Sequence, residues 1–172
     1  MPGRHSIARR GLHRGLLLRG VLLAALLPWL GACSAIVFYN EPGAPNLHFR
    51  ATSNGKFLMY TAIHLDIHRV TADCRAEYVG SHHVWAPLGQ TTDPVHLPEE
   101  RLSLLEFKFH SHGNIESWTS YKTLLRPRAG HTYEAAVNYD AGLYEVEIRE
   151  TGPNGGPGRK IEHRSLSDCN RA

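Results

Sequence analysis

Hydrophobic and polar residues alternate along most of the chain after residue 45. This alternation, with a period of two residues, occurs in five segments: 57–70, 101–110, 117–125, 132–139 and 144–149. In the first of them Ile63, Leu65 and Ile67 form one set, and the polar residues between them form the other. Because successive side chains of a strand point to opposite faces, this pattern predicts strands with one buried face and one polar face.

Turn signals separate these segments. Asn54-Gly55, Gly113-Asn114 and the segments 126–130 and 140–142 are rich in the residues that tight turns require. We expect residues 74–79 to form a short strand. We expect 80–94 to be a loop, 95–97 a brief extended piece, 151–158 a flexible loop and 161–166 a last strand. Seven or more short strands without a convincing helix predict an all-β fold, an antiparallel β-sandwich of immunoglobulin- or transthyretin-like type.

The first 32 residues have a different pattern. Five arginines and no acidic residue precede an apolar run, Val21–Leu30. A basic start, a short apolar run and small residues at its end predict a secretory signal peptide. The run is too short for a membrane span, which needs about 20 apolar residues.

The end of this run carries a cysteine. Leu30-Gly31-Ala32-Cys33 resembles the bacterial lipobox and matches it at all four positions. The resemblance implies that the Cys33 thiol receives fatty acyl chains such as palmitate and that cleavage occurs just before it. Ser34 in the following position implies the outer membrane, with the domain on its periplasmic face. The expected organisation is a signal peptide in 1–32, a lipidated tether in 33–45 and a β-sandwich domain in 46–172.

Removal of the signal peptide changes the charge of the protein. The whole chain has 19 basic and 16 acidic residues, and five of the basic ones lie in 1–32. The mature part therefore has 14 basic and 16 acidic residues, a net charge of −2. This balance and the lack of a nucleic-acid-binding motif argue against a nucleic-acid partner. The expected partners are the membrane, through the N-terminal lipid, and another envelope protein.

Two cysteines remain once Cys33 is lipidated. Cys74 and Cys169 form an even pair in an oxidising compartment, so we predict a disulfide between them. The alternative is two free thiols that bind a metal, although neither lies in a C-x-x-C motif.

The domain is also similar to small periplasmic β-sandwich lipoproteins of unknown role. The similarity lies in three stretches, "HRVTADC", "VHLPEERLSLLEF" and "LLRPRAGHTYEAAVNYDAGLYEVEI". In such chains a proline- and glycine-containing turn leads to a strand that carries a tyrosine. The resemblance implies a tyrosine corner at Tyr133 and brings no known activity.

Ten of the 12 histidines lie after residue 32, and some have the spacing of metal ligands. On an extended strand His64, Asp66 and His68 would share one face, and so would His110 and His112. Such pairs can hold Zn²⁺ or copper if a third ligand is added, and His82 and His83 are candidates. The alternative is that these residues simply make up the polar face of a strand.

Signals for catalysis are weaker. The chain has no G-x-S-x-G motif, and the disulfide would leave no thiol nucleophile. Glu99-Glu100 fits a solvated charge pair, and "GPNGGPG" lacks the Lys-Ser or Lys-Thr of a phosphate loop. Trp85 and Trp118 could stack on sugars or belong to the core. We therefore expect no enzyme, no cofactor and no catalytic residue.

The sequence thus favours an outer-membrane lipoprotein whose β-sandwich acts as a non-catalytic binding or envelope-accessory component. Loops at the ends of a sandwich and exposed edge strands are the expected binding elements. Two other classes stay open at this point: a zinc- or copper-binding periplasmic protein that uses the strand histidines, and a purely structural envelope protein.

Overall fold

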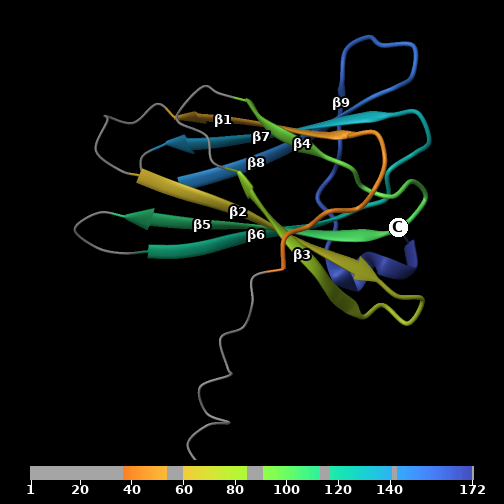
Figure 1. Ribbon diagram of the computed structural model, residues 1–172, viewed down its shortest axis with the longest axis horizontal. Helices are drawn as coiled ribbons and strands as arrows, with labels where there is room; N and C mark the ends of the chain where they lie inside the picture. Colours follow the sequence, from red (N-terminus) through yellow and green to blue (C-terminus); the bar gives the residue numbers. More distant parts are fainter. Residues whose placement is uncertain (1–36, 54–59, 85–90, 113–116, 141–142, 172) are drawn as a thin grey trace, which may run out of the picture. The chain divides into compact units, whose positions relative to one another are not determined.

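A computed structural model describes residues 37–53, 60–84, 91–112, 117–140 and 143–171 (Figure 1). These residues belong to one compact unit, Ile36–Ala172. The expected signal peptide and the lipobox cysteine lie outside the described residues. Within the described part, no helix is long and apolar enough to cross a membrane.

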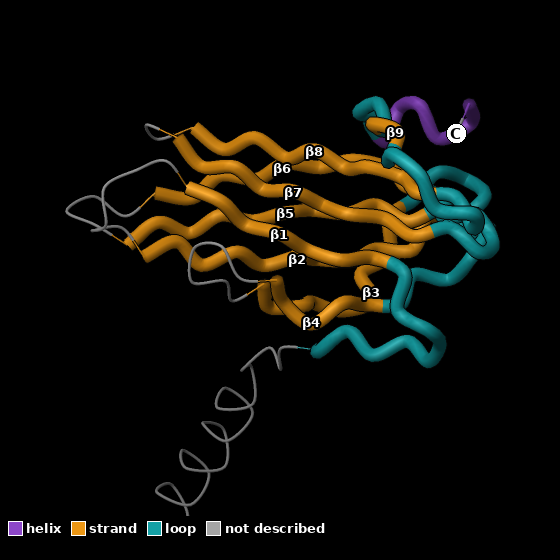
Figure 2. The backbone as a smooth tube through the Cα atoms, turned by 90° about the horizontal axis from the view of Figure 1, so that it is seen from above, coloured by secondary structure: helices purple, strands orange, loops and turns teal. Residues whose placement is uncertain are grey.

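Two sheets form the unit, and their strands lie in two layers (Figures 1 and 2). One sheet has five strands in the order β4-β1-β7-β8-β9, with the bounds β1 (Leu47–Ser53), β4 (Thr91–Val95), β7 (Thr132–Asp140), β8 (Leu143–Thr151) and β9 (Arg159–Lys160). The other has four strands in the order β3-β2-β5-β6, with the bounds β2 (Tyr60–Val70), β3 (Ala76–Val84), β5 (Ser103–His112) and β6 (Ser117–Leu125).

The prediction of an all-β sandwich is confirmed. Most neighbouring strands are antiparallel, but β1 is parallel to β7, with Leu47 opposite Tyr133. In immunoglobulin constant domains the first and second strands share a sheet, whereas here β1 and β2 lie in different sheets. The strand order therefore differs from that of an immunoglobulin constant domain.

The core lies between the two sheets, and the period-two pattern accounts for it. Ile63, Leu65 and Ile67 of β2 are buried there, as expected, and so are the alternate apolar residues of the neighbouring strands. Phe107 and Phe109 of β5 are at most 1% exposed. Because one residue of slip would turn each apolar set toward solvent, this burial fixes the register of the four-stranded sheet.

Two sequence predictions about connecting segments are wrong. Residues 80–94 are not one loop, because β3 continues to Val84 and Thr91–Val95 forms β4. Polar residues can alternate on an edge strand, and Pro94 is tolerated because β4 is also at an edge. Nor do residues 161–166 form a strand; β9 is only Arg159–Lys160, and a 3-10 helix, η2 (Leu166–Arg171), ends the described chain.

A disulfide joins Cys74 to Cys169, as predicted, with 5.8 Å between their Cα atoms. It links the turn after β2 to η2. Beneath it lies a small second core of Leu102, Leu104 and Leu124. The alternative of two free metal-binding thiols is therefore excluded by this structure.

Residues 37–39 lie along β3, although the sequence suggested a tether there. Ser81 N–H donates to the carbonyl oxygen of Val37 over 2.8 Å, and Tyr39 N–H donates to that of Ser81 over 2.9 Å. Phe38 thus forms a parallel bridge with Ser81. This pairing covers part of the free edge of β3.

Candidate functional site on the four-stranded sheet

The outer face of the four-stranded sheet carries a row of polar residues. Strand pairing places Asp66 of β2 opposite Ser81 of β3 on one side and opposite Glu106 of β5 on the other. Glu106 in turn lies opposite Lys122 of β6. Since directly opposite residues have neighbouring Cβ atoms, the register brings two carboxylates into contact range on a sheet face.

Asp66 is the more strongly hydrogen-bonded of the two carboxylates, and it is only 7% exposed. Lys108 Nζ lies 2.6 Å from its Oδ2, and the hydroxyl of Ser81 donates to its Oδ1. Burial by itself would raise the pKa of Asp66, but the hydrogen bonds from Lys108 and Ser81 lower it below its usual value. Asp66 raises the pKa of Lys108 in return, so this pair is charged at neutral pH.

Glu106 completes the group with a histidine. It is 9% exposed, and its carboxylate lies 3.1 Å from Lys122 Nζ and 3.5 Å from His68 Nε2. The Nε2 atom of His68 is buried and has no hydrogen-bond partner in the described part of the structure. One ligand atom from each of Asp66, His68 and Glu106 lies within 4.8 Å of the others.

Two carboxylate oxygens and one imidazole nitrogen are a donor set that suits a divalent transition-metal ion such as Zn²⁺ or Mn²⁺. Three protein ligands would leave further coordination positions for water. Lys108 and Lys122 compete with such an ion because both already neutralise the carboxylates. Their side chains are 40% and 55% exposed, so both ammonium groups can move into solvent and leave the carboxylates to an ion.

The other histidines named from the sequence do not join this group. The rings of His64 and His83 meet edge to face, 4.3 Å apart, and His110 stacks on Trp118 at 3.6 Å. Burial and then the neighbouring His83 lower the pKa of His64. His82 instead stacks on Phe49 of the five-stranded sheet, with 5.4 Å between ring centroids.

The predicted ligand set is therefore divided. His64, Asp66 and His68 do share one face of β2, as expected, but only the last two belong to the carboxylate–histidine group. The side chain of His112 and all of Trp85 lie outside the described residues. Trp118 is 64% exposed, which excludes it from the core.

Glu106 was not identified from the sequence as a possible ligand. It lies between Leu105 and Phe107 in an alternating segment, so its place on the polar face could be read. Its position opposite Asp66 depends on the register between β2 and β5, which the sequence of neither strand shows.

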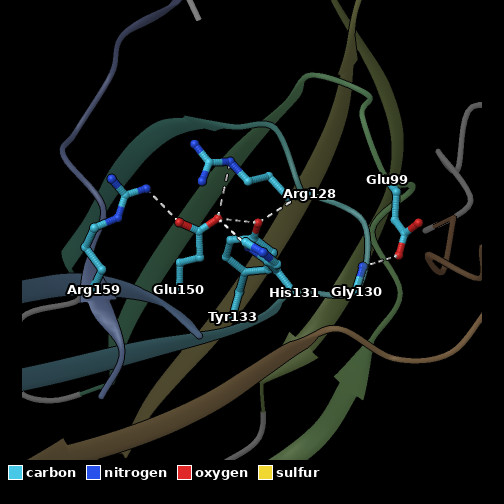
Figure 3. A network of polar contacts seen from close by, with 7 residues as sticks. All are labelled: Glu99, Arg128, Gly130, His131, Tyr133, Glu150 and Arg159. Atoms are coloured by element: carbon cyan, nitrogen blue, oxygen red, sulfur yellow. Dashed lines mark hydrogen bonds and ion pairs between the residues drawn. The ribbon is translucent and has the colours of Figure 1, made fainter. Parts of the chain in front are cut away.

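A third buried carboxylate, Glu150, lies at one end of the five-stranded sheet (Figure 3). It accepts hydrogen bonds from the Tyr133 hydroxyl at 3.0 Å, from Arg159 at 2.7 Å and from His131 Nδ1 at 3.0 Å, and Arg128 Nε lies 3.7 Å away. Burial would raise the pKa of Glu150, but the bonds from Arg159, His131 and Tyr133 lower it to about 2. This network holds the end of the sheet together.

The tyrosine corner implied by the sequence is part of this network. The backbone N–H of Arg128 donates to the Tyr133 hydroxyl over 2.8 Å (Figure 3). That hydroxyl donates onward to Glu150, and burial raises the pKa of Tyr133 to about 12. The corner is therefore confirmed, with a carboxylate as an additional partner.

The glutamate pair of the sequence, Glu99-Glu100, is exposed, as expected for a solvated charge pair. Glu99 accepts a bond from the backbone N–H of Gly130 over 3.2 Å. This contact joins two turns.

Comparison of this chain with protein families, with curated proteins and with solved structures gave no match.

Proposed function

We propose that this protein is an outer-membrane lipoprotein whose disulfide-bonded β-sandwich faces the periplasm and acts as a non-catalytic binding component of the envelope. The membrane is one partner, through acyl chains on Cys33. The other is an envelope protein that the sandwich binds. The resemblance to small periplasmic β-sandwich lipoproteins supports the same proposal.

The observation that carries the proposal is the division of the three cysteines. Cys74 and Cys169 are joined to each other. Cys33 is thus the cysteine left for another chemistry, and it is the last residue of L-G-A-C. A disulfide is also typical of exported proteins, because the cytosol keeps thiols reduced.

Metabolic labelling with a fatty-acid analogue tests the anchor. The wild-type protein should take up label in a bacterial host that processes lipoproteins, and Cys33→Ser should lose it. The double variant Cys74→Ser and Cys169→Ser is the matched control and should keep the label. Equal labelling of wild type and Cys33→Ser would refute lipidation at Cys33.

The edge of β6 supports binding of a protein partner by strand addition. Leu124 N–H donates outward to the carbonyl oxygen of Arg164, so the C-terminal segment covers the second half of this edge. Backbone groups alternate in direction along a strand, so Ser120 presents its N–H to the same outer side. A partner strand can therefore pair with the first half of β6, beside the exposed Trp118.

Ser120→Pro tests this mode of binding, because proline removes the outward N–H and is tolerated on an edge strand. Crosslinking in the native envelope followed by capture should recover a specific partner with wild type and with Ser120→Ala. Capture should fall with Ser120→Pro, while fatty-acid labelling stays the same. Undiminished capture by Ser120→Pro would exclude the edge of β6 as the binding element.

One observation favours a second function, binding of a divalent metal ion. It is the approach of Asp66, His68 and Glu106 to within 4.8 Å. Elemental analysis of protein equilibrated with Zn²⁺, Cu²⁺ or Mn²⁺ and then passed through a desalting column tests it. Stoichiometric metal in wild type and in His48→Ala, lost in His68→Ala with Glu106→Gln, would establish this function. No bound metal in the wild type would exclude it.

A further inference from the structure

The first described residues pair with the edge of β3 through one isolated bridge, Phe38–Ser81. Val37 and Tyr39 bond to Ser81 of β3 through their backbones, and Figure 1 shows the chain entering beside β3. The Tyr39 hydroxyl donates to the carbonyl oxygen of His96 over 2.7 Å. A Cβ at Gly80 would lie only 2.8 Å from the Tyr39 backbone, so this close approach requires glycine. Residues 37–39 are thus fixed to the domain.

An apolar patch surrounds this bridge. Phe38 is 69% exposed, Val37 is 49% exposed and Tyr78 is 47% exposed. The Tyr78 hydroxyl lies 3.4 Å from the carbonyl oxygen of Val37, and the Phe38 ring lies 5.9 Å from that of His83. We call Val37, Phe38 and Tyr78 the N-terminal patch. Only Trp118 and Leu143 add to the large apolar side chains that are exposed in the described part of the chain.

Covalent geometry places this patch near residue 33. Four peptide units separate the Cα atoms of Cys33 and Val37, and at no more than about 3.6 Å each they span about 14 Å. The polar headgroup region on one side of a bilayer is about 5–8 Å thick. A domain anchored through Cys33 therefore cannot hold Val37 far from the lipid headgroups.

We propose that the N-terminal patch rests in the interfacial region of the bilayer that holds the Cys33 lipid, so that the domain docks on phospholipid through the edge of β3. The inference depends on the proposed lipidation of Cys33. Aromatic side chains favour this interface because their rings are apolar and their polar atoms reach water. Arg75, just before β3, and Glu77 of β3 are both exposed and carry opposite charges, so docking should not require anionic lipid.

Photocrosslinking in the envelope tests the docking. The probe is benzoylphenylalanine in place of Tyr78, the member of the N-terminal patch that belongs to β3. The matched control is the same substitution at Leu143, which is 76% exposed and begins β8 of the other sheet. Mass spectrometry of the same samples reports both phospholipid adducts at the probe and acylation at Cys33.

The expected result is an acylated Cys33 with phospholipid adducts at position 78 and few at position 143. Adding Val37→Ser and Phe38→Ser should reduce the adducts at position 78 about tenfold, since two apolar side chains leave the contact. Acylated protein with equal adducts at both positions, or with undiminished adducts in the serine variant, would overturn the docking and leave the anchor intact. Absence of acylation at Cys33 would overturn both.

Discussion

The domain has two places where carboxylates are buried beside a histidine and two cations, and they differ in whether the histidine nitrogen is hydrogen-bonded. Glu150 accepts from Tyr133 and His131, and both of its oxygens have partners (Figure 3). On the four-stranded sheet, Glu106 lies opposite a second carboxylate, Asp66. The distance from His68 Nε2 to Glu106 Oε2 is 3.5 Å.

This difference separates a structural network from a candidate site. Buried polar groups normally have hydrogen-bond partners. The Tyr133–Glu150 pair meets this rule, because the Tyr133 hydroxyl donates to the Glu150 carboxylate at the end of the five-stranded sheet. The buried Nε2 of His68 departs from it. A group that keeps a buried imidazole nitrogen without a hydrogen bond to any described residue, next to two carboxylates, can accept a cation. A histidine that is bonded to its carboxylate, as His131 is, is best explained by stability.

The largest expected effect is that of Glu150→Ala. The substitution leaves the buried Tyr133 hydroxyl and the His131 ring without their acceptor, so we expect a loss of about 3 kcal/mol in the free energy of unfolding. Urea denaturation of the variant and of Glu134→Ala, a partly exposed control on β7, measures it. A loss below that of the control would show that the network does not hold the sheet end.

The next effect is a change in acid stability. Because the pKa of Glu150 is lowered to about 2 in the folded state, its stabilising contribution is complete above about pH 4.5 and is lost as the pH falls toward 2. Glu150→Gln should therefore flatten the dependence of unfolding free energy on pH in this range. Denaturation at a series of pH values measures the slope, and an unchanged slope would contradict the network.

Tyr133→Phe should have a smaller effect than Glu150→Ala, about 1–2 kcal/mol. It removes one donor to Glu150 and the acceptor of the Arg128 N–H, while the ring stays in the core. Thermal unfolding compared with Tyr121→Phe, which alters a half-buried ring on β6, checks this value. Equal losses in the two variants would mean that the corner adds nothing specific.

Glu106→Gln should change stability least, by less than about 1 kcal/mol. It removes an ion pair with the half-exposed Lys122 and relieves the repulsion from Asp66, so its two consequences offset each other. Denaturant unfolding in low and high salt measures it. A loss comparable to that of Glu150→Ala would make the sheet-face group structural and would remove the distinction between the two regions.

The sequence predicted the strands best where apolar residues alternate with polar ones, because such a strand has one buried face and one solvent-exposed face. The segment around Leu65 in β2 and the segment around Tyr133 and Val137 in β7 were placed correctly for this reason. The disulfide was predictable because the expected lipidation of Cys33 leaves two cysteines, and two cysteines allow one pairing. The tyrosine corner at Tyr133 was implied by the resemblance to β-sandwich lipoproteins.

Features that depend on contacts between distant strands could not be predicted. The edge strand β3 carries Ser81, His82 and His83, a polar sequence that reads as a loop until its pairing with β2 is known. The placement of Glu106 beside Asp66 required the register between two strands about 40 residues apart. The stacking of His82 on Phe49 required the packing of one sheet on the other.

The central claim is that a lipid on Cys33 holds this domain at the membrane, and the mass of the N-terminal peptide tests it most directly. Protein purified with detergent from the envelope of a lipoprotein-processing host should yield a peptide that begins at Cys33 and carries acyl chains. A peptide that continues from the uncut leader through Cys33, with the thiol unmodified, would contradict the account.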